Sequence, residues 1–312
     1  MQRPPLPGRL PGPVVDTHCH LDVADGKSDF APADAVAAAA RVGVTRIVQV
    51  GCDVAGSQWA VRAAHHWPGV VAAVAVHPND AARLGPDLAP ALTAIERLAA
   101  DPQVRAVGET GLDHFRTRDA AGHRIQKQAF AFHIELAKRF DRTLVIHDRD
   151  AHADILDVLD AEGAPERIVM HCFSGDATFA RACLDRGAHL SFGGTVTFKK
   201  SDELRAALAI TPADRVLTET DAPYLTPEPY RGRPNASYLI PHTAAVIADV
   251  LGRDLVEICG HLNDNADRAF GGPWSETDLS ETDLSETDPS ETDAGETDTG
   301  EASNPGADDG LR

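Results

Sequence analysis

Six side chains of the types that bind divalent cations stand at or near the ends of short apolar runs in this 312-residue sequence. They occur in VVDTHCHLD, AVGETGLD, LVIHDRD, IVMHCFSG and VLTETDAPY, and they are His18, His20, Glu109, His147, His171 and Asp221. Four imidazoles and two carboxylates are more than one tetrahedral ion requires. They suit two cations about 3.5–4 Å apart, which together can generate hydroxide from water and stabilise both oxygens of a phosphoryl displacement. The set therefore predicts a two-metal hydrolase.

The segment DTHCH predicts a chelating pair at the end of a strand. Strict alternation of side chains places Asp16, His18 and His20 on one face and Thr17 and Cys19 on the other. Two imidazoles at i and i+2 then point the same way and can share one cation. Cys19 is predicted to pack on the opposite face, away from the metal.

Two carboxylates are predicted to have roles beyond holding an ion. Glu109 lies between Gly108 and Gly111, which allow the backbone to approach closely and turn, and a carboxylate can bridge two cations where an imidazole cannot. Asp221 can act as a ligand and as a general base. Glu219, two residues before it, is expected to orient a ligand. We therefore assign catalytic roles to Glu109 and Asp221.

The remaining histidines are less specific signals. His147 and His171 each end a predicted strand, where a lone histidine is more often a satisfied buried side chain than a ligand. Cys172, next to His171, is sent by alternation to the opposite face. His77, at another strand end, is expected to contact substrate.

The elements that must position these residues alternate along the chain. Eight strands are predicted at 14–19, 46–50, 70–76, 104–109, 143–147, 167–172, 189–193 and 215–220. Helical stretches lie between and after them, for example at 32–42, 55–66, 120–140, 201–210, 240–251 and 254–269. Apolar strands alternating with helices indicate an α/β fold with a parallel sheet covered on both faces.

The ligands distinguish a closed barrel from an open doubly wound sheet. They fall on the first, fourth, fifth, sixth and eighth strands, and neighbouring strands lie about 4.8 Å apart, so an open sheet would spread them too widely for one cluster. A closed barrel brings all carboxyl ends of its strands to one face. We therefore expect a TIM-like (β/α)8 barrel over residues 14–271, with the metal site at the C-terminal face of the strands.

The two ends of the chain differ in kind from this body. Residues 1–13 hold five prolines and little that could pack, and we expect them to be disordered. Residues 272–312 contain a pentad repeat that begins SETDL at Ser275, with almost no large apolar residues. Such a composition predicts a disordered acidic tail.

Charge and cysteine usage restrict the class of protein. Residues 271–312 carry thirteen acidic residues and one arginine, a net of −12, so the body accounts for −7 of the total of −19. A mildly acidic body argues against a broad nucleic-acid-binding surface but allows a locally basic cleft. Five cysteines without CxxC spacing predict reduced thiols in a cytoplasmic protein. No apolar run approaches the roughly 20 residues that span a membrane.

From Val14 to Phe270 the sequence resembles the TatD-type metal-dependent deoxyribonucleases, within the wider metallo-dependent hydrolase barrels. The resemblance lies in VVDTHCHLD, AVGETGLDHF, HCFSG, SFGGTVTFKK and ETDAPYLTPEPYRGRPN, in the family's order. It implies one metal held by His18, His20, Glu109 and Asp221, and a second held by Glu109, His147 and His171. It also implies a magnesium-dependent nuclease, often a 3′-exonuclease on single-stranded DNA. Ligand softness favours zinc or manganese over magnesium for four histidines, so the metal stays open.

The family motif continues Arg-Gly-x-x-Asn-Glu-Pro, whereas Asn235 is followed here by Ala236 and Ser237. We expect this loop to touch substrate, so the departure bears on substrate preference. Phosphate contacts are expected from basic residues after the fifth, seventh and eighth strands, namely Arg149, Lys199, Arg231 and Arg233.

Three functions are compatible with such a site. The first is a phosphodiesterase on DNA that acts as a monomer without a stable protein partner. The second is an amide or ester hydrolase, such as a deacylase, because barrels of this kind host both chemistries. The third is a metal-stabilised scaffold whose acidic tail recruits partners, which retention of all six ligands disfavours.

Overall fold

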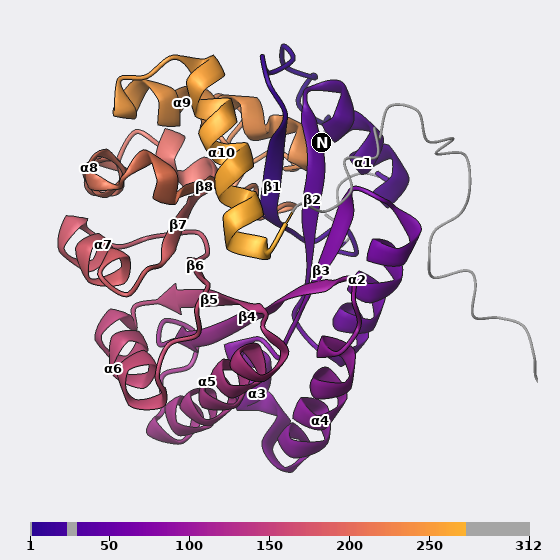
Figure 1. Cartoon of the computed structure of the whole chain (residues 1–312), viewed down its shortest axis with the longest axis vertical. Helices are drawn as coiled ribbons and strands as arrows, with labels where there is room; N and C mark the ends of the chain where they lie inside the picture. The colour runs from indigo at the N-terminus through magenta and orange to yellow at the C-terminus, as the bar shows by residue number, and fades with distance from the viewer. Residues whose placement is uncertain (1, 24–29, 273–312) are drawn as a thin grey trace, which may run out of the picture.

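Eight parallel strands form a single sheet in which each strand pairs with the next along the chain (Figure 1). The computed structural model describes residues 2–23 and 30–272. The strands are β1 (Val14–Cys19), β2 (Val44–Gly51), β3 (Val70–Val74), β4 (Val104–Asp113), β5 (Thr143–Arg149), β6 (Ile168–Met170), β7 (His189–Phe192) and β8 (Val216–Thr218). Past β8, Asp221 N donates to His18 O at 2.9 Å and a bridge joins Cys19 to Ala222, so the sheet closes on β1. The predicted (β/α)8 TIM-like barrel is confirmed.

Ten α-helices surround the strands of the described part of the chain. They are α1 (Pro32–Arg41), α2 (Val54–His66), α3 (Pro78–Leu84), α4 (Leu88–Ala99), α5 (Ala120–Phe140), α6 (His152–Glu162), α7 (Ala177–Leu184), α8 (Asp202–Ile210), α9 (Ile240–Leu251) and α10 (Leu255–Phe270). Asp53, Asp119 and Asp176 cap α2, α5 and α7 through side-chain oxygens that accept backbone N–H groups of the first turn.

The inside of the barrel is filled by small and β-branched side chains. Val15, Val48, Val71, Ala106 and Val145 point inward from successive strands and are buried. Ala266, Ala269 and Phe270 of α10 join this cluster, and α10 lies across the barrel next to β1 and β8 (Figure 1). Because this plug fills one end, the opposite end, where the strands finish, is left for chemistry.

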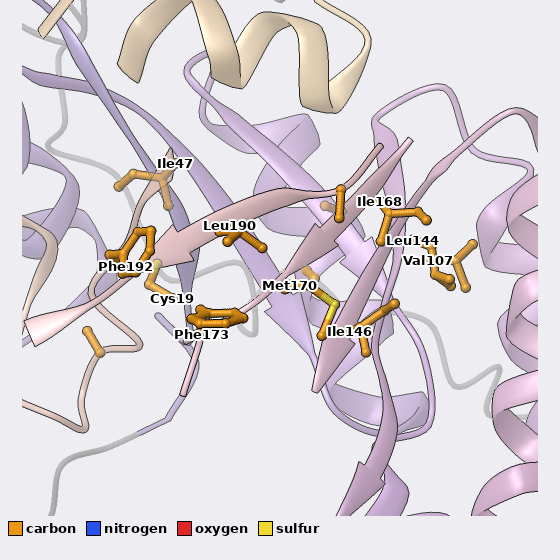
Figure 2. Close-up of a cluster of buried hydrophobic side chains, with 14 of the residues drawn as sticks. Cys19, Ile47, Val107, Leu144, Ile146, Ile168, Met170, Phe173, Leu190 and Phe192 are labelled. Carbon is orange, nitrogen blue, oxygen red and sulfur yellow. The ribbon is translucent and has the colours of Figure 1, made fainter. Parts of the chain in front are cut away.

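A second apolar layer lies between the outer face of the strands and the helices. Figure 2 shows part of it, with Cys19 and Phe192 at one end and Leu144 and Val107 at the other. Cys19 is fully buried there, as the prediction that its side chain faces away from the metal requires.

The N-terminal segment corrects the expectation of disorder for residues 1–13. Residues 2–13 pack on the barrel: Leu10 is buried, and its backbone N–H donates to Val42 O at 2.9 Å. Tyr238 Oη donates to Pro4 O at 2.7 Å. Prolines remove donors and leave acceptors, so a proline-rich segment can be held through its carbonyls and one apolar anchor. The acidic repeat of the tail lies outside the described residues.

Across residues 2–23 and 30–272, no helix combines the length and apolar character needed to cross a bilayer.

One buried histidine couples the fold to pH. His133 of α5 accepts from Val76 N at its Nε2, so its Nδ1 carries the proton and donates to Thr110 Oγ1 at 2.8 Å. Burial lowers the pKa of His133 to about 3. Between that value and about 6.5 the unfolded chain binds a proton that the folded chain does not. The contribution of His133 to stability is therefore full above about pH 6.5 and is lost as the pH falls toward 3.

We predict that His133→Gln flattens the acid limb of the stability curve by up to about 1.4 kcal/mol per pH unit, the slope expected for one proton. The measurement is the urea midpoint from pH 4 to pH 8 for wild type, His133→Gln and the surface control His65→Gln. An unchanged slope for His133→Gln would show that burial does not set this titration.

Candidate active site

Glu109 lies at the centre of a histidine cluster at the carboxyl ends of the strands. Its Oε2 is 3.5 Å from His18 Nε2 and 4.0 Å from His20 Nε2. His20 Nε2 is also 3.5 Å from Asp221 Oδ1, and Glu109, His18 and His20 are buried. This side of Glu109 thus faces two imidazoles of β1 and the carboxylate that follows β8.

The other oxygen of Glu109 faces a second set of imidazoles. Its Oε1 is 2.5 Å from His147 Nδ1, 3.4 Å from His171 Nε2 and 3.5 Å from His77 Nε2. His77, expected only to contact substrate, therefore lies within the cluster. One carboxylate with an oxygen toward each set is the geometry of a bridging ligand.

Extra residues in two strands position these groups. Between the pairs Asp16↔Ile47 and Cys19↔Gln49, β1 advances three residues while β2 advances two. Such a bulge shifts every later side chain to the other face. The prediction that Asp16 shares a face with His18 and His20 is therefore wrong.

Asp16 has a structural role and does not belong to the histidine cluster. Its Oδ1 accepts from Thr220 N at 2.9 Å and its Oδ2 from Thr220 Oγ1 at 2.6 Å. Burial raises the pKa of Asp16 to about 6. These bonds tie β1 to the segment after β8 that carries Asp221.

The second bulge lies at Glu109 itself. From Val107↔Leu144 to Thr110↔Ile146, β4 advances three residues and β5 two. A Cβ on Gly108 would lie 2.5 Å from Val145 Cβ, and one on Gly111 would lie 2.2 Å from His147 O, so both positions require glycine. The predicted strand end at Glu109 is wrong, since β4 continues to Asp113.

Outer partners fix the orientation of the imidazoles. His20 Nδ1 lies 2.9 Å from Val50 O. His171 Nδ1 lies 2.9 Å from Glu219 Oε1 as an ion pair without hydrogen-bond geometry, so the orienting role expected for Glu219 stays a prediction. Asp113, which the sequence reasoning missed, lies with Oδ2 3.4 Å from His147 Nε2. Its place in GLD, four residues after Glu109, is the signal that was available.

The cluster is electrostatically balanced by its own groups. Burial alone would raise the pKa of Glu109, but His171, His77 and His147 hold it well below its usual range. Burial would lower the pKa of His147, yet Glu109 and Asp113 raise it to about 10. For His18, burial and the nearby His171 lower the pKa.

A divalent cation fits these residues. Ligand atoms lie within 4.8 Å of one another in three groups: His18, His171 and Asp221; His18, His20 and Glu109; His77, Glu109 and His147. Both ring nitrogens of His18 are buried without a hydrogen-bond partner. A buried imidazole without a partner is costly unless it binds an ion, so His18 supports a metal centre.

The sequence reasoning also did not identify Cys52, which follows β2, as a neighbour of the cluster. Its Sγ lies 3.9 Å from His20 Nδ1 and 3.9 Å from Glu109 Oε2. Burial raises its pKa to about 11, so the neutral thiol donates to Glu109.

We predict that Cys19→Ser and Cys172→Ser keep full metal content. Cys19 is buried in the outer layer, and Cys172 belongs to none of the three groups of candidate ligands among the described residues. Metal per protein by elemental analysis tests this, with circular dichroism as the check on folding. Loss of metal from either folded variant would contradict the assignment of faces.

The basic residues expected to contact phosphate lie at this face, Arg149 as the last residue of β5 and the other three in loops. The Arg149 guanidinium stands 4.2 Å from the Phe115 ring centroid, Arg231 4.2 Å from that of Phe198, and Arg233 5.6 Å from that of Tyr230. Lys199 is exposed. None of them is among the ion pairs of the histidine cluster.

The departure from the family motif falls on buried positions. Asn235 Nδ2 donates to Thr220 O at 2.9 Å and to Tyr224 O at 2.6 Å. Ala236 and Ser237 are buried behind it. These residues therefore brace the loop after β8 from behind, and the expectation that the loop itself touches substrate stays a prediction.

Barrel and cluster together define a metal-dependent hydrolase. Residues 15–271 match the family described as TatD related DNase, and the chain belongs to that family.

Individual proteins similar to this chain also carry the name TatD. The chain is 45% identical over 264 residues to an uncharacterized metal-dependent hydrolase TatD of Mycobacterium tuberculosis, covering 84% of this chain and 99% of that protein. It is 33% identical over 245 residues to a 3′-5′ ssDNA/RNA exonuclease TatD of Citrobacter rodentium, covering 76% and 91%. The crystal structure of YJJV, a TatD homolog from Escherichia coli, superposes with a TM-score of 0.76 at 27% identity, covering 83% of this chain and 98% of that one.

Proposed function

We propose that this protein is a two-metal phosphodiesterase that removes nucleotides from single-stranded DNA, in the 3′-to-5′ direction. The observation that carries the proposal is Glu109, whose Oε2 faces His18 and His20 while its Oε1 faces His147, His171 and His77. When bound, two divalent cations would lower the pKa of water and neutralise charge on the phosphoryl oxygens. The exonuclease name of the Citrobacter rodentium relative supports the choice of substrate.

The ligands divide between the two oxygens of Glu109. His18, His20 and Asp221 would hold one ion with Oε2. His147, with His171 or His77, would hold the other with Oε1. We propose magnesium for these ions, as the family resemblance implies, with manganese or zinc as the alternatives that the number of imidazoles favours. Because all of these groups come from one chain, we propose that the monomer is the catalytic unit.

Asp221 would accept the proton of the attacking water. Burial would raise its pKa, but His20 and His171 lower it, so the carboxylate is ionised at neutral pH. Its side chain keeps 14% exposure, which leaves an oxygen accessible to water. A partly exposed, ionised carboxylate beside the cluster is suited to general-base catalysis.

Glu219 and Asp113 would keep the rings of His171 and His147 in register with the ions. Loss of such outer partners typically costs 10- to 100-fold in metal affinity or activity.

The test is a metal-loaded assay on single-stranded DNA labelled at the 3′ or the 5′ end, run beside duplex DNA and a panel of acyl esters and amides. Stepwise loss of nucleotides from the 3′ end supports the proposal. Hydrolysis of the acyl panel without cleavage of DNA would instead establish the deacylase alternative.

A further inference from the structure

Two exposed aromatic rings lie in loops at the end of the barrel that carries the histidine cluster. Phe115 is 45% exposed and Tyr224 is 53% exposed, and both follow strands at the face that carries the cluster. The other exposed large apolar side chains among the described residues, Leu6, Val23 and Val256, are aliphatic. Exposed aromatic rings offer a large flat apolar surface that a ligand can cover.

Tyr224 lies on the side of His20 and Asp221. Its ring centroid is 6.3 Å from that of His20, at an interplanar angle of 65°. Its main chain is fixed at both polar atoms, because Tyr224 N donates to Asp221 O at 2.8 Å and Asn235 Nδ2 donates to Tyr224 O. The Tyr224 ring is therefore held on a fixed backbone beside Asp221, the proposed general base.

Phe115 lies in the loop after β4, on the side of the cluster where Asp113 contacts His147. It follows Asp113, whose Oδ2 contacts His147 Nε2, and β4 there pairs with β5 so that Asp113 lies opposite Arg149. The Arg149 guanidinium stands 4.2 Å from the Phe115 ring centroid, and Arg118 is 5.9 Å away.

A ring next to a guanidinium matches the chemistry of a nucleotide. The base can stack on the aromatic or guanidinium plane, and the phosphate can pair with the cation. An acyl chain would gain nothing from the charge. The carboxylates of Glu109, Asp113 and Asp221 lie in or next to the cluster, so cations at its rim favour the approach of a polyanion.

We propose that Tyr224 and Phe115 with Arg149 are two stacking platforms that hold the bases on either side of the scissile phosphate. The inference rests on the phosphodiesterase function proposed above and adds the groups that select single strands. Bases stacked within a duplex have no free face for these rings, whereas an unpaired end can place one base on each platform.

The test is a double-mutant cycle between the protein and the substrate. Tyr224→Ala and Phe115→Ala are each assayed on a single-stranded oligonucleotide and on copies with one abasic residue at the first, second or third position from the cleaved end. On intact strands each variant should lower kcat/KM roughly 5- to 100-fold, the range expected for one lost stacking contact. On the strand that lacks the stacked base, the same variant should cost less than about twofold, because the contact is already missing.

Matched substitutions separate stacking from apolar bulk and from folding. Phe115→Leu and Tyr224→Leu keep an apolar side chain and should behave as the alanine variants do, whereas Tyr224→Phe should keep the dependence on the base. Val256→Ala removes an exposed aliphatic group of α10 and serves as the surface control. Melting temperature and metal content are measured for every variant.

The outcomes are distinct. An equal loss on intact and abasic strands would mean that the rings only shape the loops, and no loss on either would mean that they do not bind bases. Either result overturns the platforms while leaving the phosphodiesterase in place. Failure of metal-loaded wild type to cleave any DNA would overturn the proposed function itself.

Discussion

Replacing Glu109 with alanine is expected to abolish the binding of both cations and to lower hydrolysis by about a thousandfold or more. The two oxygens of Glu109 face different imidazole sets, so this one change removes a ligand from each proposed ion. Without this carboxylate, any cation that enters the site has lost the buried negative charge that would compensate it. Loss of several kcal/mol of charge stabilisation in the transition state corresponds to a rate factor of this size.

The comparison that tests this prediction is a series of single alanine variants at His18, His147 and His77, with the exposed Glu162→Ala as control. Metal per protein and kcat are measured for each. Each histidine variant should keep part of its metal, because it removes a ligand from one side only. A histidine variant that loses more metal and activity than Glu109→Ala would show that Glu109 does not bridge.

Removal of metal should abolish hydrolysis while the barrel stays folded. The interior cluster around Val48 and Val145, plugged by Phe270, contains no metal ligand, so the apolar core survives chelation. Adding back a divalent ion should restore activity and raise the melting temperature, because an ion that binds only the folded chain stabilises it by about 2.7 kcal/mol at a hundredfold excess over Kd.

The assay compares chelated, dialysed and reconstituted protein, with magnesium, manganese and zinc supplied separately. Circular dichroism and a thermal melt confirm that the metal-free protein is folded. Hydrolysis by folded protein whose elemental analysis shows no metal would contradict the account.

Much of the architecture was predictable because ligand chemistry and strand order constrain each other. Eight apolar runs alternate with helices, and side chains such as His18 and His171, far apart in sequence, can meet only if the sheet closes. The structure brings all six predicted ligands to one place, and it adds His77.

The errors have a common physical origin in local irregularity. Alternation assumes a regular strand, but one extra residue in β1 moves Asp16 off the face of His18, and another in β4 places Glu109 inside a strand and not at its end. Sequence periodicity contains no signal for such a shift unless glycines such as Gly108 mark it.

Other features that the sequence did not predict depend on tertiary contacts. Residues 2–13 pack because Leu10 finds a buried site and Tyr238 reaches the carbonyl of Pro4. Cys52 and Asp113 approach the cluster only because β2 and β4 end beside it. Composition does not encode these approaches, and only Asp113 has a signal in the spacing, because it stands four residues after Glu109.

The most direct test of the central claim is a crystal structure of the metal-loaded protein with anomalous diffraction from manganese or zinc, accompanied by elemental analysis. We expect two ions per chain about 3.5–4 Å apart, one at each oxygen of Glu109, with His18 and His20 on one side and His147 on the other. A single ion at full occupancy, or two ions that do not share Glu109, would contradict the two-metal site.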